Sequence, residues 1–360
     1  MEVFSCKTKV IAGAGAVSAL AEFGAKRVFL VTDPYFAKNG VAVKVAAEAK
    51  AEAVEIFDGV KPDPTVALAA EGTAKLKAFQ PDLIVALGGG SAMDCAKAMG
   101  YFGKGNYRFA AIPTTSGSGS EVTDFAILTH EKVKHPLVDE KLRPDVAILD
   151  SDLLQQLPAS LIADSGFDVL AHALEACVAT GAGALTDMLA REAFCSTYGN
   201  LPASFAGQRQ VRLKIHQAAT FAGMAFTQAG LGLCHAMAHA LGGMFHVPHG
   251  RLNAILLPSV IGANAHVAGH QYAEIARAAG ISGSADTVAV RNLRNGLVRL
   301  RRELNLPDTL AKAGVDPRRV WQETGAIVEA TLADPCCKTN PMKVEDFMVR
   351  RILEEVTGRV

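Results

Sequence analysis

Short apolar runs rich in β-branched and aromatic residues alternate with longer amphipathic stretches up to about residue 155. Such runs are typical of strands in a parallel sheet, because helices cover both faces of that sheet. The alternation therefore predicts a doubly wound α/β domain with a mostly parallel sheet. The expected strands are residues 28–31, 54–57, 83–87, 109–112 and 146–149.

The strand pattern stops near residue 158, and the rest of the chain has helical periodicity interrupted by Gly, Pro and Asn. At 360 residues the chain is long enough for two domains. We expect an α/β domain over residues 1–157 and an all-α domain over residues 158–360. Residues 124–138 alternate around a polar centre, which predicts a short hairpin at the edge of the first domain.

Charge and cysteine usage exclude several classes of protein. The 36 Lys and Arg residues balance 36 Asp and Glu residues, so nothing predicts binding to nucleic acid or to an anionic membrane. The 7 cysteines are scattered and form no Cys-x-x-Cys pair, which favours a reducing cytoplasm over a disulfide framework. Glycines interrupt the apolar stretch 10–21, so we expect no signal peptide. No run of about eighteen apolar residues predicts a transmembrane helix.

Three consecutive glycines follow the predicted strand 83–87 and precede a predicted helix. Glycine lets the backbone approach a phosphate closely, and the N–H groups of a helix N-terminus favour a bound anion. A plain strand-to-helix turn is the alternative, but such a turn rarely needs three glycines. The candidate cofactor-binding residues here are Gly88, Gly89, Gly90, Ser91 and Asp94.

A second loop of small and hydroxylated residues, 112–123, follows the next predicted strand. Taken alone it could be a flexible loop. Ligands of open α/β sheets bind beyond the carboxyl ends of the strands, so two such loops at adjacent strand ends predict a nucleotide site. This loop adds the candidates Thr114, Thr115 and Ser118.

Asp33 follows Thr32 at the end of the predicted strand 28–31. A carboxylate there could bond the ribose hydroxyls of a dinucleotide and repel a 2′-phosphate, which would select NAD over NADP. The alternative is a turn aspartate that precedes Pro34.

Residues with metal-binding side chains form two groups. Asp168 and His172 are four residues apart, so on a helix they project from the same face. Four histidines on Gly-rich helices would be costly to desolvate unless they bind a ligand. One carboxylate and three imidazoles suit Fe²⁺, Zn²⁺, Co²⁺ or Mn²⁺, and the spacing neither ranks these metals nor selects three of the four histidines. The four are His235, His239, His246 and His249.

These motifs resemble those of the iron-dependent, or group III, alcohol dehydrogenase family over essentially the whole chain. GGGSAMD, PTTSGSGSEVT, GFDVLAHALEA and the histidine segment through NAILLP look like the family's four main motifs, in order and at the expected intervals. The resemblance implies a dehydroquinate synthase-like fold. FAGMAFTQAGLGL and the KTNP near the C-terminus look most like the propanol or ethanol dehydrogenases of bacterial microcompartments.

The resemblance also implies roles for the residues of the metal segment. It selects iron, with zinc as the alternative, and gives His239 a position near the substrate and the nicotinamide. His239 would there relay the released proton or orient His235 by a hydrogen bond. The implied metal ligands are Asp168, His172, His235 and His249.

Other positions match the family's cofactor and substrate sites. Lys134 matches a lysine beside the cofactor, and Asp33 matches the residue that discriminates between NAD and NADP. The positions that look like the wall of the substrate pocket are Phe125, Phe226 and Cys336.

The implied function is the NAD(H)-dependent interconversion of a short-chain primary alcohol and its aldehyde, such as propanol and propanal or ethanol and acetaldehyde. A divalent metal would polarise the substrate oxygen, and hydride would move to or from C4 of the nicotinamide. The alternatives are a reductase of a sulfonated, hydroxylated or diol-derived aldehyde, which an Arg251 facing the substrate would favour, and a glycerol-dehydrogenase-like polyol oxidoreductase. A dehydroquinate-synthase-like lyase would need extra basic residues for a phosphate, and a non-enzymatic binding protein would need no substrate access.

The expected partners are the small alcohol or aldehyde and other copies of the chain in a homodimer or larger homo-oligomer. Microcompartment enzymes are further possible partners, whereas nucleic acid and membranes are not expected. The expected location is the cytoplasm or a bacterial microcompartment.

Overall fold

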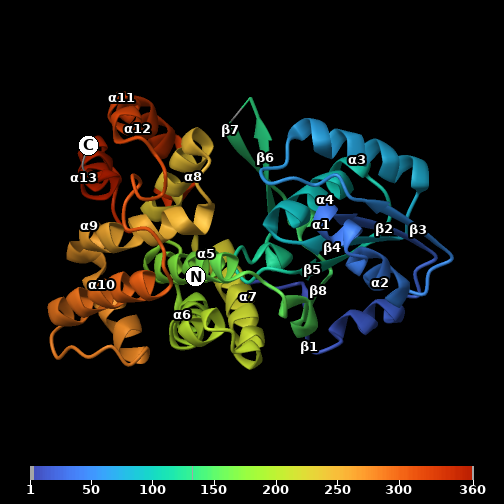
Figure 1. The fold of residues 1–360 in the computed structure, drawn as a ribbon, viewed down its shortest axis with the longest axis horizontal. Coiled ribbons are helices and arrows are strands. Elements are labelled where there is room, and N and C mark those ends of the chain that lie inside the picture. Colours follow the sequence, from blue (N-terminus) through green and yellow to red (C-terminus); the bar gives the residue numbers. More distant parts are fainter. Residues whose placement is uncertain (1–3, 132, 359–360) are drawn as a thin grey trace. The chain divides into compact units, whose positions relative to one another are not determined.

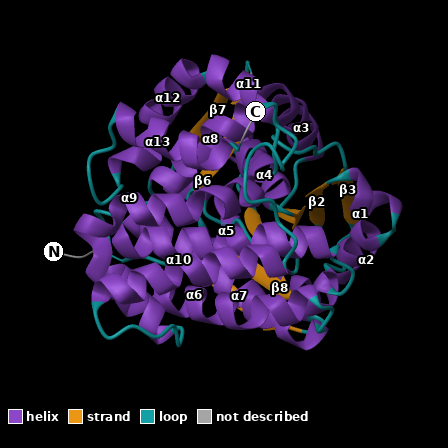
Figure 2. Ribbon diagram, turned by 60° about the vertical axis from the view of Figure 1, so that its left-hand side comes forward, coloured by secondary structure: helices purple, strands orange, loops and turns teal. Residues whose placement is uncertain are grey.

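The computed structural model describes residues 4–131 and 133–358, which divide into two compact units. One unit is Ser5–Leu157, and the other comprises Phe4 and the residues from Pro158 onward. Among the described residues, all strands belong to the first unit, and the second unit contains only helices and loops (Figure 2).

The α/β unit contains a six-stranded sheet with the strand order β1-β8-β5-β4-β2-β3, and all neighbouring strands are parallel (Figure 1). Five of these strands confirm the strands predicted from the sequence. They are β2 (Arg27–Thr32), β3 (Ala53–Phe57), β4 (Leu83–Gly88), β5 (Arg108–Pro113) and β8 (Val146–Asp150). The sixth strand, β1 (Lys9–Gly13), was not predicted, because this edge strand is mostly exposed and therefore lacks a buried apolar run.

Helices cover both faces of this sheet, as a doubly wound fold requires. Along β2, Val28 and Leu30 pack with η1 (Ala16–Phe23) and α2 (Val41–Glu48), while Phe29 and Val31 pack on the opposite face. The opposite face is covered by α3 (Val66–Phe79) and α4 (Gly90–Gly103). This alternation follows from the two-residue period of a strand, in which successive side chains point to opposite faces.

Two further strands form the predicted hairpin. β6 (Phe125–His130) and β7 (Val133–Val138) pair in antiparallel fashion. The remaining elements of the unit are short. They are α1 (Pro34–Lys38), η2 (Ser120–Val122), η3 (Glu140–Leu142) and η4 (Ser151–Leu154).

The helical unit is built around α5 (Ala159–Val178), which packs against four other helices. Nearly every residue from Ile162 onward in this helix is buried, because most of its side chains are apolar or small and neighbouring helices pack around it. Its neighbours are α6 (Ala184–Phe205), α7 (Arg212–Ala229), α8 (Leu233–Phe245) and α9 (His249–Ala278).

The longest helix, α9, has 30 residues and is apolar enough by length and composition to cross a membrane. However, 61% of its most apolar window is buried inside the structure, which is typical of a core helix. The rest of the unit comprises η5 (Arg209–Val211), α10 (Asp286–Glu303), α11 (Pro317–Gln322), α12 (Thr324–Ala333), η6 (Pro335–Lys338) and α13 (Asp346–Thr357).

Candidate active site

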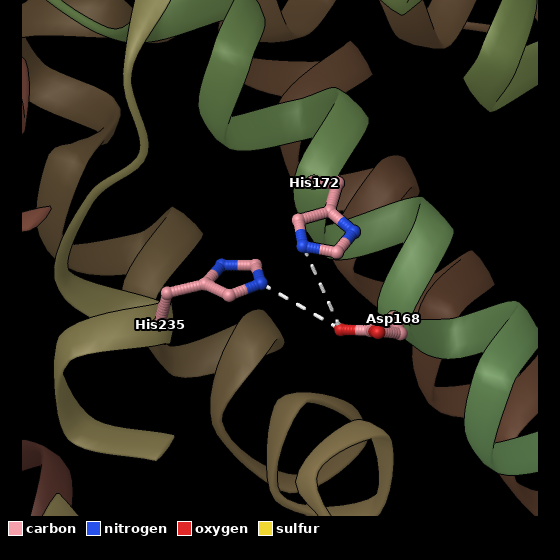
Figure 3. A group of neighbouring side chains, drawn as sticks. All are labelled: Asp168, His172 and His235. Carbon is pink, nitrogen blue, oxygen red and sulfur yellow. Dashed lines mark ion pairs between the residues drawn. The ribbon is translucent and has the colours of Figure 1, made fainter. Parts of the chain in front are cut away.

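Three helices bring one carboxylate and three imidazoles together inside the helical unit. Asp168 and His172 lie one turn apart on α5, His235 lies in the first turn of α8, and His249 is the first residue of α9. Figure 3 shows His172 and His235 turned towards the carboxylate of Asp168. All three of these side chains are buried.

The distances in this cluster suit a single cation. The Nε2 atoms of His172, His235 and His249 lie 3.9, 3.6 and 3.4 Å from Oδ1 of Asp168. Four ligand atoms at about 2.1 Å around a tetrahedral metal are separated by roughly 3.4 Å. The side chains therefore need only small movements to share one metal ion.

The electrostatics of the cluster also fit a cation. Burial alone would raise the pKa of Asp168, but the three imidazoles hold it well below its usual range. Burial alone would lower the pKa of His235, but the carboxylates of Asp168 and Glu175 raise it to about 9. The carboxylate of Asp168 thus stays charged, and a divalent cation that replaces protons at the imidazoles would balance its charge.

Glu175 fixes the orientation of His235, a role that sequence reasoning missed. Its Oε2 lies 2.5 Å from Nδ1 of His235, and its Oε1 accepts a hydrogen bond of 2.7 Å from the backbone N–H of Cys234. A proton held on Nδ1 leaves the lone pair of Nε2 for a metal. The signal was present in HALEA, because residues 168, 172 and 175 share one face of a helix.

Asn253 is a second residue that sequence reasoning missed. It lies one turn after His249 on α9, it is fully buried, and its Nδ2 donates a hydrogen bond of 2.8 Å to Oδ1 of Asp168. The same nitrogen lies 3.3 Å from Nε2 of His249. The i, i+4 spacing from His249 was visible in HGRLN, but a lone asparagine on an apolar helix carries no specific signal.

His239 belongs to a neighbouring group of side chains. Its Nδ1 lies 2.9 Å from Oδ2 of Asp334, and its ring stacks on that of His249 with the centroids 5.2 Å apart. The prediction that His239 orients His235 by a hydrogen bond is wrong, because Glu175 occupies Nδ1 of His235. His246 ends α8 as an exposed residue.

The three residues predicted to line the substrate pocket lie in different surroundings. The ring of Phe226 stacks on His172 with a centroid distance of 4.4 Å, so it contacts the cluster directly. Cys336 lies beside Asp334 in η6. Phe125 belongs to the α/β unit, where it begins β6, and its role stays a prediction.

Arg251 forms a paired contact within the helical unit. Its Nε and Nη2 donate hydrogen bonds of 3.1 and 2.9 Å to the two oxygens of Asp164, one turn before Asp168 on α5. The guanidinium charge is therefore already balanced by a carboxylate.

In the α/β unit, the three glycines lie where β4 meets α4, and other predicted residues surround them. A Cβ on Gly88 would lie 3.6 Å from Oδ2 of Asp33, and one on Gly89 would lie 3.2 Å from Oγ1 of Thr115. A Cβ on Gly90 would lie 3.1 Å from Oγ of Ser118. Gly88 has a φ of +151°, which favours glycine. The other candidates of these loops are Ser91, next to Gly90 in α4, and Thr114, whose N–H bonds the carbonyl of Gly88.

Asp33 has the turn role considered for it, and its role in cofactor selection stays a prediction. Its Oδ1 accepts hydrogen bonds from the N–H groups of Tyr35 and Phe36 and so caps α1. Its Oδ2 is the oxygen nearest to Gly88. One oxygen therefore holds the turn, while the other lies at the glycine loop.

Asp94 and Lys134 are both engaged within the protein. Asp94 accepts hydrogen bonds from Oγ of Ser120 and the N–H of Ile127, and burial raises its pKa. Lys134 forms an ion pair of 2.8 Å with Asp63. Asp94 thus ties α4 to β6, a placement that favours a positioning role over direct contact with a cofactor.

Comparison with known families identifies the chain. The model "Iron-containing alcohol dehydrogenase" matches residues 7–151, and the model "Fe-containing alcohol dehydrogenase family, C-terminal" matches residues 162–357. The chain belongs to the iron-containing alcohol dehydrogenase family. The resemblance stated from the motifs is thereby confirmed, and the chain is an alcohol dehydrogenase.

Relatives of this iron-containing alcohol dehydrogenase match it from end to end. The 1-propanol dehydrogenase PduQ of Citrobacter freundii is 38% identical, and the match covers 99% of this chain and 100% of that protein. The NADPH-dependent butanol dehydrogenase of Clostridium saccharobutylicum is 35% identical, with 98% and 97% covered. The iron-containing alcohol dehydrogenase structure from Thermococcus thioreducens superposes with a TM-score of 0.90 at 33% identity, with 98% of each chain covered.

Lys97 of this alcohol dehydrogenase is a third residue that sequence reasoning missed. It is 1% exposed, and its Nζ donates hydrogen bonds to Oγ of Ser120, to Oγ1 and the carbonyl of Thr123, and to the carbonyl of Phe125. It therefore holds the end of the hydroxyl-rich loop against α4. A lysine in an amphipathic helix usually faces solvent, so the sequence carried no signal for this role.

Proposed function

We propose that the enzyme interconverts a short-chain primary alcohol and its aldehyde with NAD(H), at a metal centre formed by Asp168, His172, His235 and His249. The observation that carries this proposal is the convergence of three Nε2 atoms on one carboxylate oxygen. A divalent cation at this position supplies Lewis acidity, which polarises the oxygen of an alcohol or an aldehyde.

The protein's own residues hold and orient this centre. Asp168 supplies the negative charge, and Glu175 keeps the proton of His235 on Nδ1. Phe226 covers one face of His172 and so excludes water from that side. Nitrogen and oxygen donors of this kind suit Fe²⁺ and also Zn²⁺, and the family name favours Fe²⁺.

For the dinucleotide, we propose the loop between β4 and α4. Gly89 caps α4 without any side-chain hydrogen bond, so no capping side chain occupies the N-terminus of this helix at the glycines. Thr115, Ser118 and the second oxygen of Asp33 surround the same glycines. The bound nicotinamide dinucleotide supplies or accepts the hydride. Lys134 is proposed to stay near the cofactor while Asp63 holds it.

His239 is proposed to pass the released proton towards solvent. Its side chain is 24% exposed, whereas that of His235 is 1% exposed, so it links the buried centre to water. Asp334 orients it through Nδ1, which leaves Nε2 available.

A simple aldehyde fits the site better than a sulfonated one. Arg251, which would attract a sulfonate, is already paired with Asp164. The names of the relatives, a propanol and a butanol dehydrogenase, also favour unsubstituted substrates. Within the helical unit, Phe226 and Cys336 are proposed to line the substrate pocket.

The resemblance to microcompartment propanol dehydrogenases extends the proposal to location and assembly. We propose that the enzyme acts in the cytoplasm or inside a bacterial microcompartment, as a homodimer or larger homo-oligomer. The match to PduQ over nearly the whole chain supports this.

An aldehyde panel with NADH and with NADPH, on enzyme reconstituted with Fe²⁺ or Zn²⁺, tests the function. We expect the highest kcat/KM for propanal or a similar short aldehyde with NADH. A clear preference for a sulfonated aldehyde or for dihydroxyacetone would overturn the substrate proposal.

A further inference from the structure

A second group of metal-binding side chains lies beside the candidate metal centre. His239 projects from α8 one turn after His235, and Asp334 and Cys336 lie at the start of η6. A nitrogen of His239, a carboxylate oxygen of Asp334 and the sulfur of Cys336 all lie within 4.8 Å of one another. The three residues come from two segments that are about one hundred positions apart in the sequence, and α8 packs against η6.

The backbone holds this group in place. Oδ1 of Asp334 accepts a hydrogen bond of 2.9 Å from the N–H of Cys336, so the carboxylate is fixed relative to the thiol. Oδ2 of Asp334 lies 2.9 Å from Nδ1 of His239. Zinc bonds to sulfur, nitrogen and oxygen measure about 2.0–2.3 Å, so ligand atoms on one zinc are roughly 3.3–3.7 Å apart. To hold such an ion, atoms at the 4.8 Å limit would have to approach by roughly 1.1–1.5 Å, and the His239–Asp334 pair at 2.9 Å would have to open by roughly 0.4 Å.

The donor set differs from that of the candidate metal centre. Asp168 and its histidines offer only oxygen and nitrogen, whereas the second group adds a sulfur. A thiolate favours soft or borderline cations such as Zn²⁺ and Cd²⁺ over Mg²⁺. The two sites are neighbours, because Nδ1 of His239 contacts Asp334 while its ring stacks on His249.

We propose that His239, Asp334 and Cys336 form a second, thiophilic cation site that takes Zn²⁺ or Cd²⁺. On binding, the thiol of Cys336 loses its proton to solvent. Nδ1 of His239 gives up its proton through solvent, and Nε2 holds the proton of the coordinated ring. Burial raises the pKa of this thiol, and the nearby Asp334 raises it further, so the cation must displace a tightly held proton. We therefore expect weaker binding here than at the Asp168 centre.

Filling this site would inhibit the enzyme. The cation would bind the nitrogen of His239 that Asp334 now orients and would remove that histidine from proton transfer. This consequence rests on the role proposed for His239. The existence of the site does not rest on that role, because cation binding can be measured without turnover.

Cadmium titration of the full-length protein, with one equivalent of Fe²⁺ already bound, tests the site. Ultraviolet thiolate-to-cadmium charge transfer reports only a sulfur ligand, so cadmium at the Asp168 centre gives no such band. The exposed Cys6 is replaced by serine in every sample, so that it does not contribute. We expect one saturable band in this background.

The matched variants are Cys336→Ser and Cys337→Ser. Cys336→Ser should abolish the band, whereas Cys337→Ser should retain it, because Sγ of Cys337 donates to the carbonyl of Thr331. Asp334→Asn should weaken cadmium binding at least tenfold, which gives a second readout if Cys336→Ser fails to fold. A band that is missing from the parent, or that survives Cys336→Ser, would overturn the proposal.

Discussion

At the residue scale, we expect the carboxylate of Glu175 to control how well the proposed ligand His235 binds metal. The Glu175→Gln substitution places a neutral amide opposite Nδ1 of His235. This amide cannot accept a charge-assisted hydrogen bond from His235 and at the same time keep the hydrogen bond from the backbone N–H of Cys234. Metal affinity should fall by about 10–100-fold. Competition with a coloured chelator measures this change.

A matched control is Glu329→Gln, which alters an exposed glutamate on α12. Its metal affinity should equal that of the parent. If Glu175→Gln also leaves metal affinity unchanged, the proposed role of Glu175 is wrong.

Asp33 offers a second test at this scale. Asparagine caps helices as well as aspartate does, so Asp33→Asn keeps α1 capped and removes only the charge at Gly88. The ratio of kcat/KM for NADPH to that for NADH should rise by roughly tenfold, the effect of about 1.4 kcal/mol of relieved repulsion. An unchanged ratio, with unchanged thermal stability, would exclude Asp33 from cofactor selection.

At the scale of elements, the close approach of α9 to α5 positions His249. A Cβ on Gly250 would lie 1.9 Å from the carbonyl oxygen of Asp164, which is backbone and cannot move cheaply. Gly250→Ala should therefore push the start of α9 away, lower the unfolding temperature and weaken metal binding. Calorimetry and metal titration on the same samples measure both effects.

Gly269, on the same helix, provides the control. A Cβ there meets nothing within 4 Å, so Gly269→Ala should keep metal binding and leave stability equal or up to about 1 kcal/mol higher. Equal behaviour of the two variants would contradict the steric argument.

Lys97 connects α4 to the loop before β6, and its burial predicts a pH effect. Burial lowers the pKa of Lys97 from 10.5 to about 8. Between these values the unfolded chain keeps a proton that the folded chain has lost, so stability rises with pH. Over this pH range the free energy of unfolding should rise by at most roughly 3 kcal/mol, and this rise should vanish in Lys97→Met. Urea unfolding of both proteins at pH 7.5 and pH 10 checks the sign, and equal pH slopes would refute it.

The elements that sequence reasoning predicted are those whose pattern reflects burial. The strand at 83–87 and its glycines were evident because both faces of β4 are buried and the turn needs glycine. β1 escaped prediction because an exposed edge strand needs no apolar pattern. Asp168 and His172 were visible as an i, i+4 pair, whereas the partners of His239 lie about 95 residues away and depend on packing that no local pattern records.

At the scale of the whole molecule, each ligand should stabilise its own unit. Metal bound at Asp168 and its histidines should protect amide hydrogens in α5 and α8, and NAD⁺ should protect the start of α4. A ligand at 100 times its Kd adds about 2.7 kcal/mol to the stability of the part it binds. Hydrogen exchange with chelator alone, and then with metal or NAD⁺ added, measures both effects. Protection of α5 and α8 by NAD⁺ in the absence of metal would contradict this assignment.

All four candidate ligands lie between positions 168 and 249, in the unit that begins at Pro158. On the proposed ligand set, packing of three helices within this one unit would be enough to capture the metal, without a nucleotide. Which ion an enzyme molecule carries would then be decided by the supply of free metal in the cell at the moment of synthesis. Growth on iron-poor or zinc-rich medium would consequently yield populations of the same polypeptide with different catalytic competence.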